Sequence, residues 1–273
     1  MTDFSNQQGV SLQVRGLRKS YDGHEVLKGV SFEVSPGEIF VIMGPSGSGK
    51  TVLLRHLVGL EMPDAGDILI DGQALQAPDT IARYREAMVF QSGALFDSLT
   101  VGENVGFYLA EHHLKAPCEI SRIVSATLEL VGLEGTQDKM PAELSGGMKK
   151  RVAIARALVV EPQLICYDEP TSELDPLSSV AIAGVIVNLN RNIHVTSLIV
   201  SHDRDLAFGI ADRIAVINEG RILAIGLPNA IKCNPDPWIQ RFLKAKVKRY
   251  EIAREDLRPH EAPEKAQLQP ATP

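Results

Sequence analysis

The sequence is short of the residues that several common classes of protein require. Its three cysteines, Cys118, Cys166 and Cys233, lie far apart and form no C-x-x-C pair, which indicates a reducing compartment and argues against a zinc site. Basic residues are outnumbered by acidic ones, and the net charge of −6 argues against nucleic acid as an electrostatic partner. No apolar run approaches the roughly 20 residues that a membrane-spanning helix needs.

The N-terminal stretch, MTDFSNQQGV, lacks the basic start and the apolar core of a secretory signal. We therefore expect a cytosolic protein, or one held at a membrane through a partner. The 273 residues, of which 44% are hydrophobic, suffice for one large or two small domains with a sizeable core.

Apolar runs with strand character alternate along the chain with amphipathic helical patterns, which predicts a mainly parallel sheet with helices on both faces. The predicted strands are residues 12–17, 26–34, 38–44, 67–72, 87–90, 163–169 and 195–203. The predicted helices are residues 51–60, 119–133 and 146–160, and the last two belong to a helical subdomain of about 92–160. A hairpin is predicted over 213–226, with its turn at Asn218-Glu219-Gly220.

A glycine-rich turn, GPSGSGKT, matches the phosphate-binding pattern G-x-x-x-x-G-K-[ST] between a strand and a helix. Glycines allow backbone N–H groups to surround phosphate oxygens, and the following helix directs its positive end at them. The lysine adds a point charge, and the threonine hydroxyl can bind Mg²⁺. The phosphate-binding residues predicted here are Gly44, Pro45, Ser46, Gly47, Ser48, Gly49, Lys50 and Thr51.

Two acids end the run LICYDE, at the carboxyl end of a predicted strand, where open α/β sheets bind ligands. Asp168 is a candidate for the Mg²⁺ shell. Alternation along the strand predicts that Glu169 lies on the other side, where it can polarise an attacking water. Cys166 in the same strand is expected to be a small buried hydrophobe.

The segment ELSGGMKKRVAIARAL resembles the signature of ABC transporter ATPases. Ser145, Gly146 and Gly147 open a helix there, and Ser-Gly-Gly at a helix N-terminus is a second place for an anion. The resemblance covers residues 11–245. It implies a P-loop NTPase with a RecA-like core sheet, an antiparallel β subdomain and an α-helical subdomain.

Further positions resemble the other motifs of that family. Tyr21 is similar to the aromatic that stacks on adenine, and Gln91 to the Q-loop glutamine, which reaches Mg²⁺ and the attacking water. His202 resembles the switch histidine at the γ-phosphate. Ser172–Asp175 resembles the D-loop, with Asp175 at the nucleotide interface. Glu173 departs from the family, which usually has a small residue there, and its carboxylate either pairs with a cation across the interface or repels nucleotide.

The resemblance also implies ligands and partners. ATP and Mg²⁺ are expected between two copies of the chain, arranged head to tail so that each phosphate loop faces the other copy's signature. The loop after Gln91 is expected to receive a helix of an integral membrane permease. For the apolar residues Leu95, Phe96 and Leu99, contact with that partner and burial in the helical subdomain both remain open.

Some segments of the sequence resemble a narrower group within that family. FQSGALFDSLTVGENV, Met148 in the signature and PDPWIQRFL resemble the ATPases of Mla-type phospholipid transporters, which work with MCE-domain proteins. This implies a peripheral ATPase on the cytoplasmic face of the inner membrane, powering phospholipid transport that maintains outer-membrane lipid asymmetry. The alternatives are the ATPase of an amino-acid or ion importer and a non-transport ABC ATPase.

The C-terminal extension, 246–273, differs in composition from the rest of the chain. Residues 237–257 have a helical pattern with a basic cluster, and three roles remain open: docking on the neighbouring subunit, contact with anionic lipid, or a solvated helix. From about Pro259 the chain is rich in proline, alanine and charge, which predicts disorder.

Overall fold

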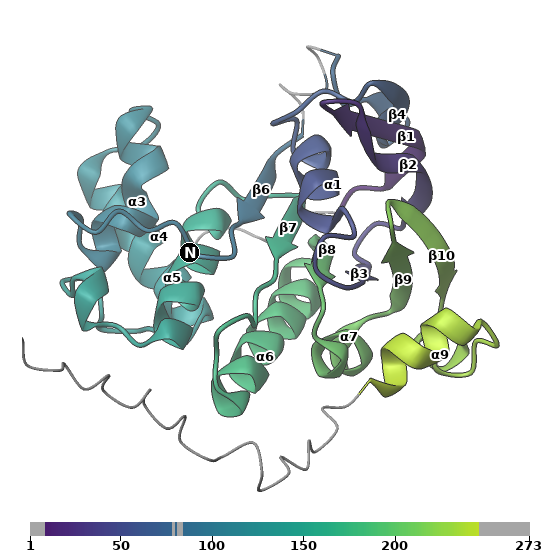
Figure 1. Cartoon of the computed structure of the whole chain (residues 1–273). Helices are drawn as coiled ribbons and strands as arrows, with labels where there is room; N and C mark the ends of the chain where they lie inside the picture. Colours follow the sequence, from purple (N-terminus) through teal and green to yellow (C-terminus); the bar gives the residue numbers. More distant parts are fainter. Residues whose placement is uncertain (1–8, 78–79, 81–83, 246–273) are drawn as a thin grey trace, which may run out of the picture.

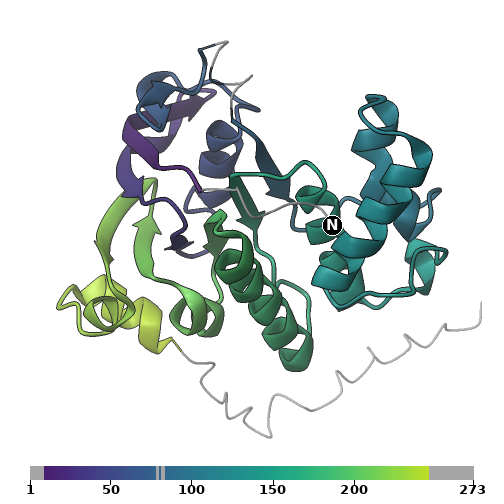
Figure 2. The same cartoon turned by 180° about the vertical axis from the view of Figure 1, so that it is seen from behind.

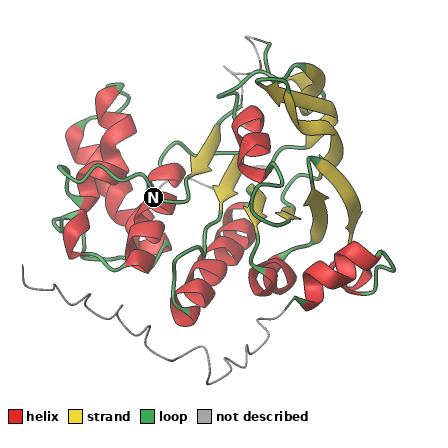
Figure 3. Ribbon diagram, viewed as in Figure 1, coloured by secondary structure: helices red, strands yellow, loops and turns green. Residues whose placement is uncertain are grey.

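Two β-sheets and a set of helices make up the described part of the chain (Figures 1 and 3). The computed structural model describes residues 9–77, 80 and 84–245. The strands are β1 (Leu12–Tyr21), β2 (His24–Val34), β3 (Ile39–Met43), β4 (Ala65–Ile70), β5 (Gln73–Ala74), β6 (Glu86–Val89), β7 (Leu164–Asp168), β8 (Thr196–Ser201), β9 (Arg213–Asn218) and β10 (Arg221–Gly226). The helices are α1 (Lys50–Leu57), α3 (Val101–Glu111), α4 (Pro117–Leu130), the 3₁₀ turn η2 (Pro141–Glu143), α5 (Gly146–Leu158), α6 (Pro176–Ile193), α7 (Arg204–Ile210), α8 (Pro228–Lys232) and α9 (Pro237–Lys244).

The larger sheet has six strands in the order β10-β9-β3-β8-β7-β6. Every neighbouring pair is parallel except β9 and β10, which form a hairpin. The strands β3, β7 and β8 are buried at every residue, as expected for parallel strands that helices cover on both faces. The mainly parallel sheet predicted from the sequence is therefore confirmed.

The two faces of this sheet belong to two separate hydrophobic cores. On one face Val41, Ile165 and Ile199 pack with helices α5, α6 and α7. On the other face Ile42 and Val200 pack with α1 and with the smaller sheet. That sheet is antiparallel, in the order β2-β1-β4-β5, and lies beside the end of the central sheet (Figure 2).

The helices α3, α4 and α5 form a block beside β6, away from the antiparallel sheet (Figures 1 and 2). Helix α4 buries the face expected from its pattern, including Ile123, Thr127 and Leu128. Helix α3 begins at a capping box, in which Thr100 and Glu103 each accept a backbone N–H from the other. Within the described ranges, no helix combines the length and the apolar character that crossing a bilayer requires.

Several local predictions are confirmed. Helix α1 ends at Leu57, and Gly59 follows with φ +67°, the left-handed conformation that glycine adopts after helix ends. The hairpin of β9 and β10 turns through Glu219 and Gly220, both at positive φ, as a tight two-residue turn requires. Helix α9 begins at Pro237 as predicted and extends to Lys244. Ala245, the next residue of the predicted helix, is its C-cap, and the extension 246–273 lies outside the described residues.

Asn104 fixes the loop that leads into α3. Its side chain is completely buried, and its amide donates to the carbonyls of Phe96, Leu99 and Thr100 at 2.9–3.0 Å while its oxygen accepts from the Phe96 N–H at 2.8 Å. These bonds hold the backbone of Phe96 to Thr100 against the first turn of α3, and the Phe96 N–H and the Leu99 carbonyl take their partner from Asn104.

We predict that Asn104→Ala lowers the free energy of unfolding by about 2 to 4 kcal/mol, because it removes the hydrogen bonds that a completely buried side chain makes to the Phe96 N–H and the Leu99 carbonyl. Urea denaturation followed by circular dichroism measures this. Asn188 on α6 is exposed and serves as the control, with an expected change of at most about 0.5 kcal/mol for Asn188→Ala. Equal midpoints for the two variants would contradict the role given to Asn104.

Candidate functional site

The glycine-rich turn joins β3 to α1 and wraps around the lysine that closes it. Nζ of Lys50 is buried and donates to the carbonyls of Gly44 and Pro45 at 2.9 and 3.1 Å. A Cβ on Gly44 would collide with the carbonyl oxygen of Ile217, and Gly49 has φ +100°, so both positions require glycine. The turn is thus a tight cradle at the N-terminus of α1, as the sequence predicts for phosphate.

Asp168 ends the buried strand β7 next to this cradle. Its carboxylate accepts the Thr51 hydroxyl at 3.1 Å. Burial raises the pKa of Asp168, and the Thr51 hydrogen bond opposes that shift. The structure therefore brings together a hydroxyl and a carboxylate, the oxygen ligands that Mg²⁺ prefers.

Glu169 leaves the strand in the left-handed region, with φ +46°. For a residue with a side chain this costs about 1–2 kcal/mol. The turn directs the carboxylate toward the cradle, where Oε1 lies 3.4 Å from Nζ of Lys50. Oε2 accepts from the Ser201 hydroxyl at 2.9 Å and from the His202 N–H at 3.1 Å, and lies 2.9 Å from His202 Nδ1.

The expectation that Glu169 lies on the other side of the strand is therefore wrong. Simple alternation fails because the strand ends at Asp168 and the next residue turns. Both carboxylates contact residues of the phosphate cradle, Asp168 through Thr51 and Glu169 through Lys50.

The donor set fits a nucleotide phosphate with Mg²⁺. The Ser48 hydroxyl is buried in the cradle and has no hydrogen-bond partner among the described residues, so a donor remains for an added oxygen. Lys50 supplies a positive charge beside it, and Thr51 with Asp168 supplies oxygen ligands.

The predicted signature residues lie elsewhere in the chain. Ser145 caps α5 by accepting the Met148 N–H at 3.3 Å. A Cβ on Gly147 would lie 3.1 Å from Ser178, and one on Gly146 would lie 3.3 Å from Leu174. The signature therefore packs against the loop after β7 and the start of α6 in its own chain. Within the described residues, no side-chain hydrogen bond joins it to the phosphate cradle.

Asp175 caps the start of α6. Its carboxylate accepts from the Ser178 hydroxyl at 2.5 Å and from the backbone N–H groups of Ser178 and Leu177 at 3.0 Å. The Ser178 hydroxyl, followed by its N–H, lowers the pKa of Asp175. Nearby Glu173 is exposed and has φ +64°, a conformation that favours glycine.

Tyr21 lies at the end of β1 with its side chain partly exposed. Its hydroxyl donates to the Glu61 carboxylate. Partial burial, and then the bond to Glu61, raise the pKa of Tyr21 to about 12, so the ring remains neutral at ordinary pH. An accessible, neutral aromatic ring is compatible with the predicted stacking on a base.

Gln91 and His202 line one cavity together with the loop Thr171–Leu174. The side chain of Gln91 is exposed, so it can reach into this space. The His202 side chain is 58% exposed although its Nδ1 is held by Glu169. The structure therefore brings Gln91 and His202 to the same cavity.

Two basic residues of α5 hold the loop after Gln91, and neither was predicted from the sequence to do so. Lys150 donates to the carbonyl of Gln91. Arg156 donates to the carbonyls of Gly93 and Ala94 at 2.9 and 2.7 Å. These hydrogen bonds join residues that are 59 to 63 positions apart in the sequence. A local sequence pattern therefore cannot predict them.

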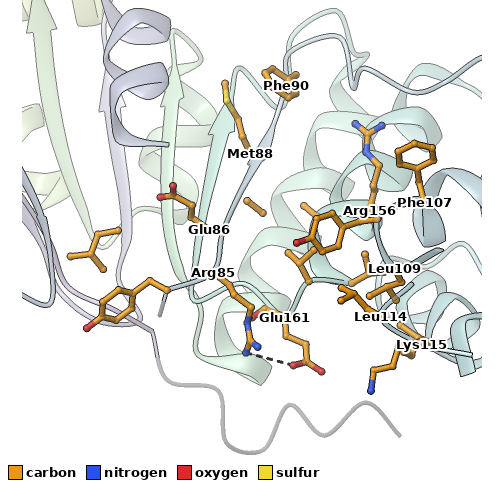
Figure 4. Close-up of a pocket in the computed structure, with 18 of the residues that line it drawn as sticks. Arg85, Glu86, Met88, Phe90, Phe107, Leu109, Leu114, Lys115, Arg156 and Glu161 are labelled. Carbon is orange, nitrogen blue, oxygen red and sulfur yellow. Dashed lines mark hydrogen bonds and ion pairs between the residues drawn. The ribbon is translucent and has the colours of Figure 1, made fainter. Parts of the chain in front are cut away.

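An apolar groove of about 870 Å³ lies between β6, α3 and the end of α5 (Figure 4). Phe96 and Phe107 meet there with ring centroids 4.7 Å apart, and Phe96 is 44% exposed. Leu95 instead packs against the main core, and Leu99 is half-buried. Burial therefore holds for Leu95, which belongs to the core, while Phe96 lines the groove, where contact with a partner stays a prediction.

Glu86 on β6 lines the same groove. Oε2 is buried and has no hydrogen bond within the described part of the chain, while neighbouring Arg85 pairs with Glu161 at 3.6 Å (Figure 4). Burial raises the pKa of Glu86 from its ordinary value of 4.5 to about 7.

We predict that Glu86→Gln raises the free energy of unfolding at pH 8 and flattens its dependence on pH. The Glu86 carboxyl binds its proton more tightly in the folded chain, so stability falls as pH rises from 4.5 to about 7. The gain at pH 8 is on the order of 2 kcal/mol. Denaturation at pH 5 and pH 8 measures it, with the more exposed, paired Glu161→Gln as control. A difference between the two pH values as large as in the wild type would contradict the prediction.

Known proteins are similar in sequence to this chain over most of its length. The sequence model of the family described as "ABC transporter" matches residues 27–172. The protein named TRIGALACTOSYLDIACYLGLYCEROL 3, chloroplastic, of Arabidopsis thaliana is 39% identical, over 88% of this chain and 75% of its own. A probable ribonucleotide transport ATP-binding protein of Mycobacterium leprae is 38% identical over 87% and 70%. A spermidine/putrescine import ATP-binding protein of Mesoplasma florum is 41% identical over 85% and 66%.

Solved structures share the fold. The ATP-binding cassette MJ0796, solved as a dimer in a post-hydrolysis state with ADP and Pi, superposes with a TM-score of 0.71 and 31% identity, over 80% of this chain and 98% of its own. The cbiO1 protein of Clostridium perfringens, part of the ABC transporter complex cbiONQ, gives 0.74 and 33% over 85% and 94%. The predicted P-loop NTPase fold is confirmed. The chain therefore belongs to the ABC transporter family, as an ATP-binding subunit that hydrolyses ATP.

Proposed function

We propose that this ATPase powers phospholipid transport between membranes and thereby maintains the lipid asymmetry of an outer membrane. The observation on which the lipid assignment depends is the sequence of residues 90–105, FQSGALFDSLTVGENV, which resembles the same segment of Mla-type ATPases. The match to a relative whose name is that of a galactolipid, over 88% of this chain, supports it.

The proposed chemistry centres on Glu169. Its carboxylate polarises the water that attacks the γ-phosphate, and His202 holds that carboxylate and contacts the γ-phosphate. Lys50 and the glycine-rich turn bind the phosphates, with Tyr21 against the base. Mg²⁺, when bound at Thr51, Asp168 and Gln91, neutralises charge that develops on the phosphate oxygens.

A second copy of the chain is the proposed first partner. Within the described residues of one chain, the signature and the phosphate cradle share no side-chain hydrogen bond, although the family resemblance assigns one signature and one cradle to each nucleotide. A head-to-tail dimer joins Ser145, Gly146, Gly147 and Asp175 of one copy to the cradle of the other. The dimeric state of the similar MJ0796 cassette supports this. ATP then links the two copies, so its binding favours the dimer by mass action.

A permease is the proposed second partner, with its cytoplasmic helix in the groove of Figure 4. Exposed apolar side chains there, including Phe96, Tyr108 and Leu114, suit the apolar face of a helix. This partner places the ATPase on the cytoplasmic face of the inner membrane, and through the permease it works with an MCE-domain protein. The complex cbiONQ, in which the similar cbiO1 takes part, supports assembly of this kind.

The alternative is the ATPase of a small-solute importer. The Mesoplasma florum relative, named for spermidine and putrescine import, favours it with 41% identity. A permease and an MCE-domain protein encoded beside this gene would favour the lipid function instead.

We predict that Glu169→Gln lowers kcat for ATP hydrolysis by about 10²- to 10⁴-fold, because the amide cannot accept a proton from water. Nucleotide affinity stays within about threefold, since the phosphate cradle is intact. Phosphate release and binding of a fluorescent ATP analogue measure the two quantities. Glu161→Gln, which changes an exposed carboxylate outside the site, is the control. Wild-type turnover in Glu169→Gln would remove Glu169 from the chemistry.

The lipid function is tested with the assembled transporter. We expect the chain to copurify with an Mla-type permease, and we expect vanadate-sensitive hydrolysis by the complex to exceed that of the subunit alone. Reconstituted vesicles then show ATP-dependent movement of a labelled phospholipid, and none with Glu169→Gln. Failure to copurify, together with equal hydrolysis by the subunit alone, would favour the importer.

A further inference from the structure

Lys150 connects three segments that the proposed chemistry uses. It lies in the second turn of α5, five residues after Ser145, and its side chain is buried. Nζ donates to the carbonyl of Gln91, to the Ser172 hydroxyl at 3.2 Å and to the carbonyl of Glu169 at 3.4 Å. An ammonium group has three N–H donors, so these three acceptors use all of them.

The surroundings of Lys150 favour a fixed position for the ammonium group. Glu173, Asp168 and Glu169 attract it, although burial has the larger effect and lowers the pKa of Lys150. A buried amine pays a high desolvation cost if it moves away from its acceptors. Its contacts are therefore specific to one arrangement of the three segments.

The carbonyl of Glu169 belongs to a residue in the left-handed region. The Ser172 N–H also donates to it, at 3.1 Å, and Lys150 adds a bond from the signature helix. A shift of that carbonyl would rotate the peptide that sets the direction of the Glu169 side chain. Lys150 therefore contacts Glu169 at its carbonyl, and within the described residues it forms no hydrogen bond with the carboxylate.

We propose that Lys150 is a positioning residue for ATP hydrolysis. It fixes the Gln91 loop and the Glu169 backbone to the signature helix α5, so that these three segments keep one position relative to one another. This inference rests on the proposed roles of Gln91 and Glu169. The inference adds to those roles the side chain that links the signature helix to Gln91 and to Glu169.

This role predicts a particular kinetic pattern. Among the residues that the structure describes, no hydrogen bond joins Lys150 to the phosphate cradle, which Lys50 closes through Gly44 and Pro45. Loss of the Lys150 bonds should therefore lower turnover and leave nucleotide affinity unchanged. A side chain that only supports the fold would change both quantities or neither.

The test uses the full chain with Mg²⁺ and ATP, and compares four variants with the wild type. Lys150→Met removes all donors at similar length, and Lys150→Gln keeps an amide donor one bond closer to the backbone. Lys149→Met makes the same change at the next position of α5, whose side chain forms no hydrogen bond or ion pair with the described residues. Glu169→Gln is the reference for lost chemistry.

We expect at least a tenfold lower kcat for Lys150→Met, with Kd for a fluorescent ATP analogue within twofold of wild type. The kcat of Lys150→Gln should lie between those of Lys150→Met and the wild type. Lys149→Met should be within twofold of wild type in both kcat and Kd. Hydrogen exchange should become faster in peptides covering residues 91–99 and 168–174 of Lys150→Met.

Less than a threefold decrease in kcat for Lys150→Met overturns the inference, and so does an equal loss of affinity. If Lys150→Met shows no cooperative melting transition, Lys150→Gln decides: at least a threefold loss of kcat with unchanged Kd supports the proposal, and a smaller loss overturns it. Wild-type turnover in Glu169→Gln removes the proposed chemistry and this inference with it. An inactive Glu169→Gln beside an unaffected Lys150→Met overturns this inference alone.

Discussion

The arrangement of the site depends on the turn that Glu169 makes where β7 ends. A glutamate does not favour φ +46°, so its neighbours must hold it there. Its N–H donates to the carbonyl of Val200 on β8 at 2.9 Å, and its carboxylate is held by Ser201 and His202 at the end of the same strand. The parallel pairing of β7 with β8 therefore sets the position of the carboxylate.

The loop after Gln91 has little regular structure, yet side chains from α3 and α5 fix it. Asn104 and Arg156 bind its backbone over residues 93–99, and Lys150 binds it at Gln91. One side of this loop lines the apolar groove through Phe96, and its start lines the cavity shared with His202. This single loop therefore borders both the apolar groove and the cavity shared with His202.

Much of the fold could be predicted from the sequence, because parallel strands buried on both faces appear as continuous apolar runs and the phosphate turn has a strict spacing. Helix α6 was not predicted, although Asp175 and Pro176 begin it. The direction of Glu169 was predicted wrongly, since alternation holds only while the strand continues. Asn104, Lys150 and Arg156 could not be identified, because a side chain that binds a distant backbone carbonyl leaves no periodic trace.

The strand β6 has a further consequence for the protein before it meets a partner. It is the last strand of the central sheet and, within the described part of the chain, it pairs with β7 alone. A free strand edge can recruit strands from other molecules, which leads to aggregation. β6 is only four residues long, it begins with Glu86 directly after Arg85, and the helical block lies beside it (Figure 1). A buried carboxylate that costs stability can thus remain useful, because it makes this edge a poor template for misassembly during synthesis.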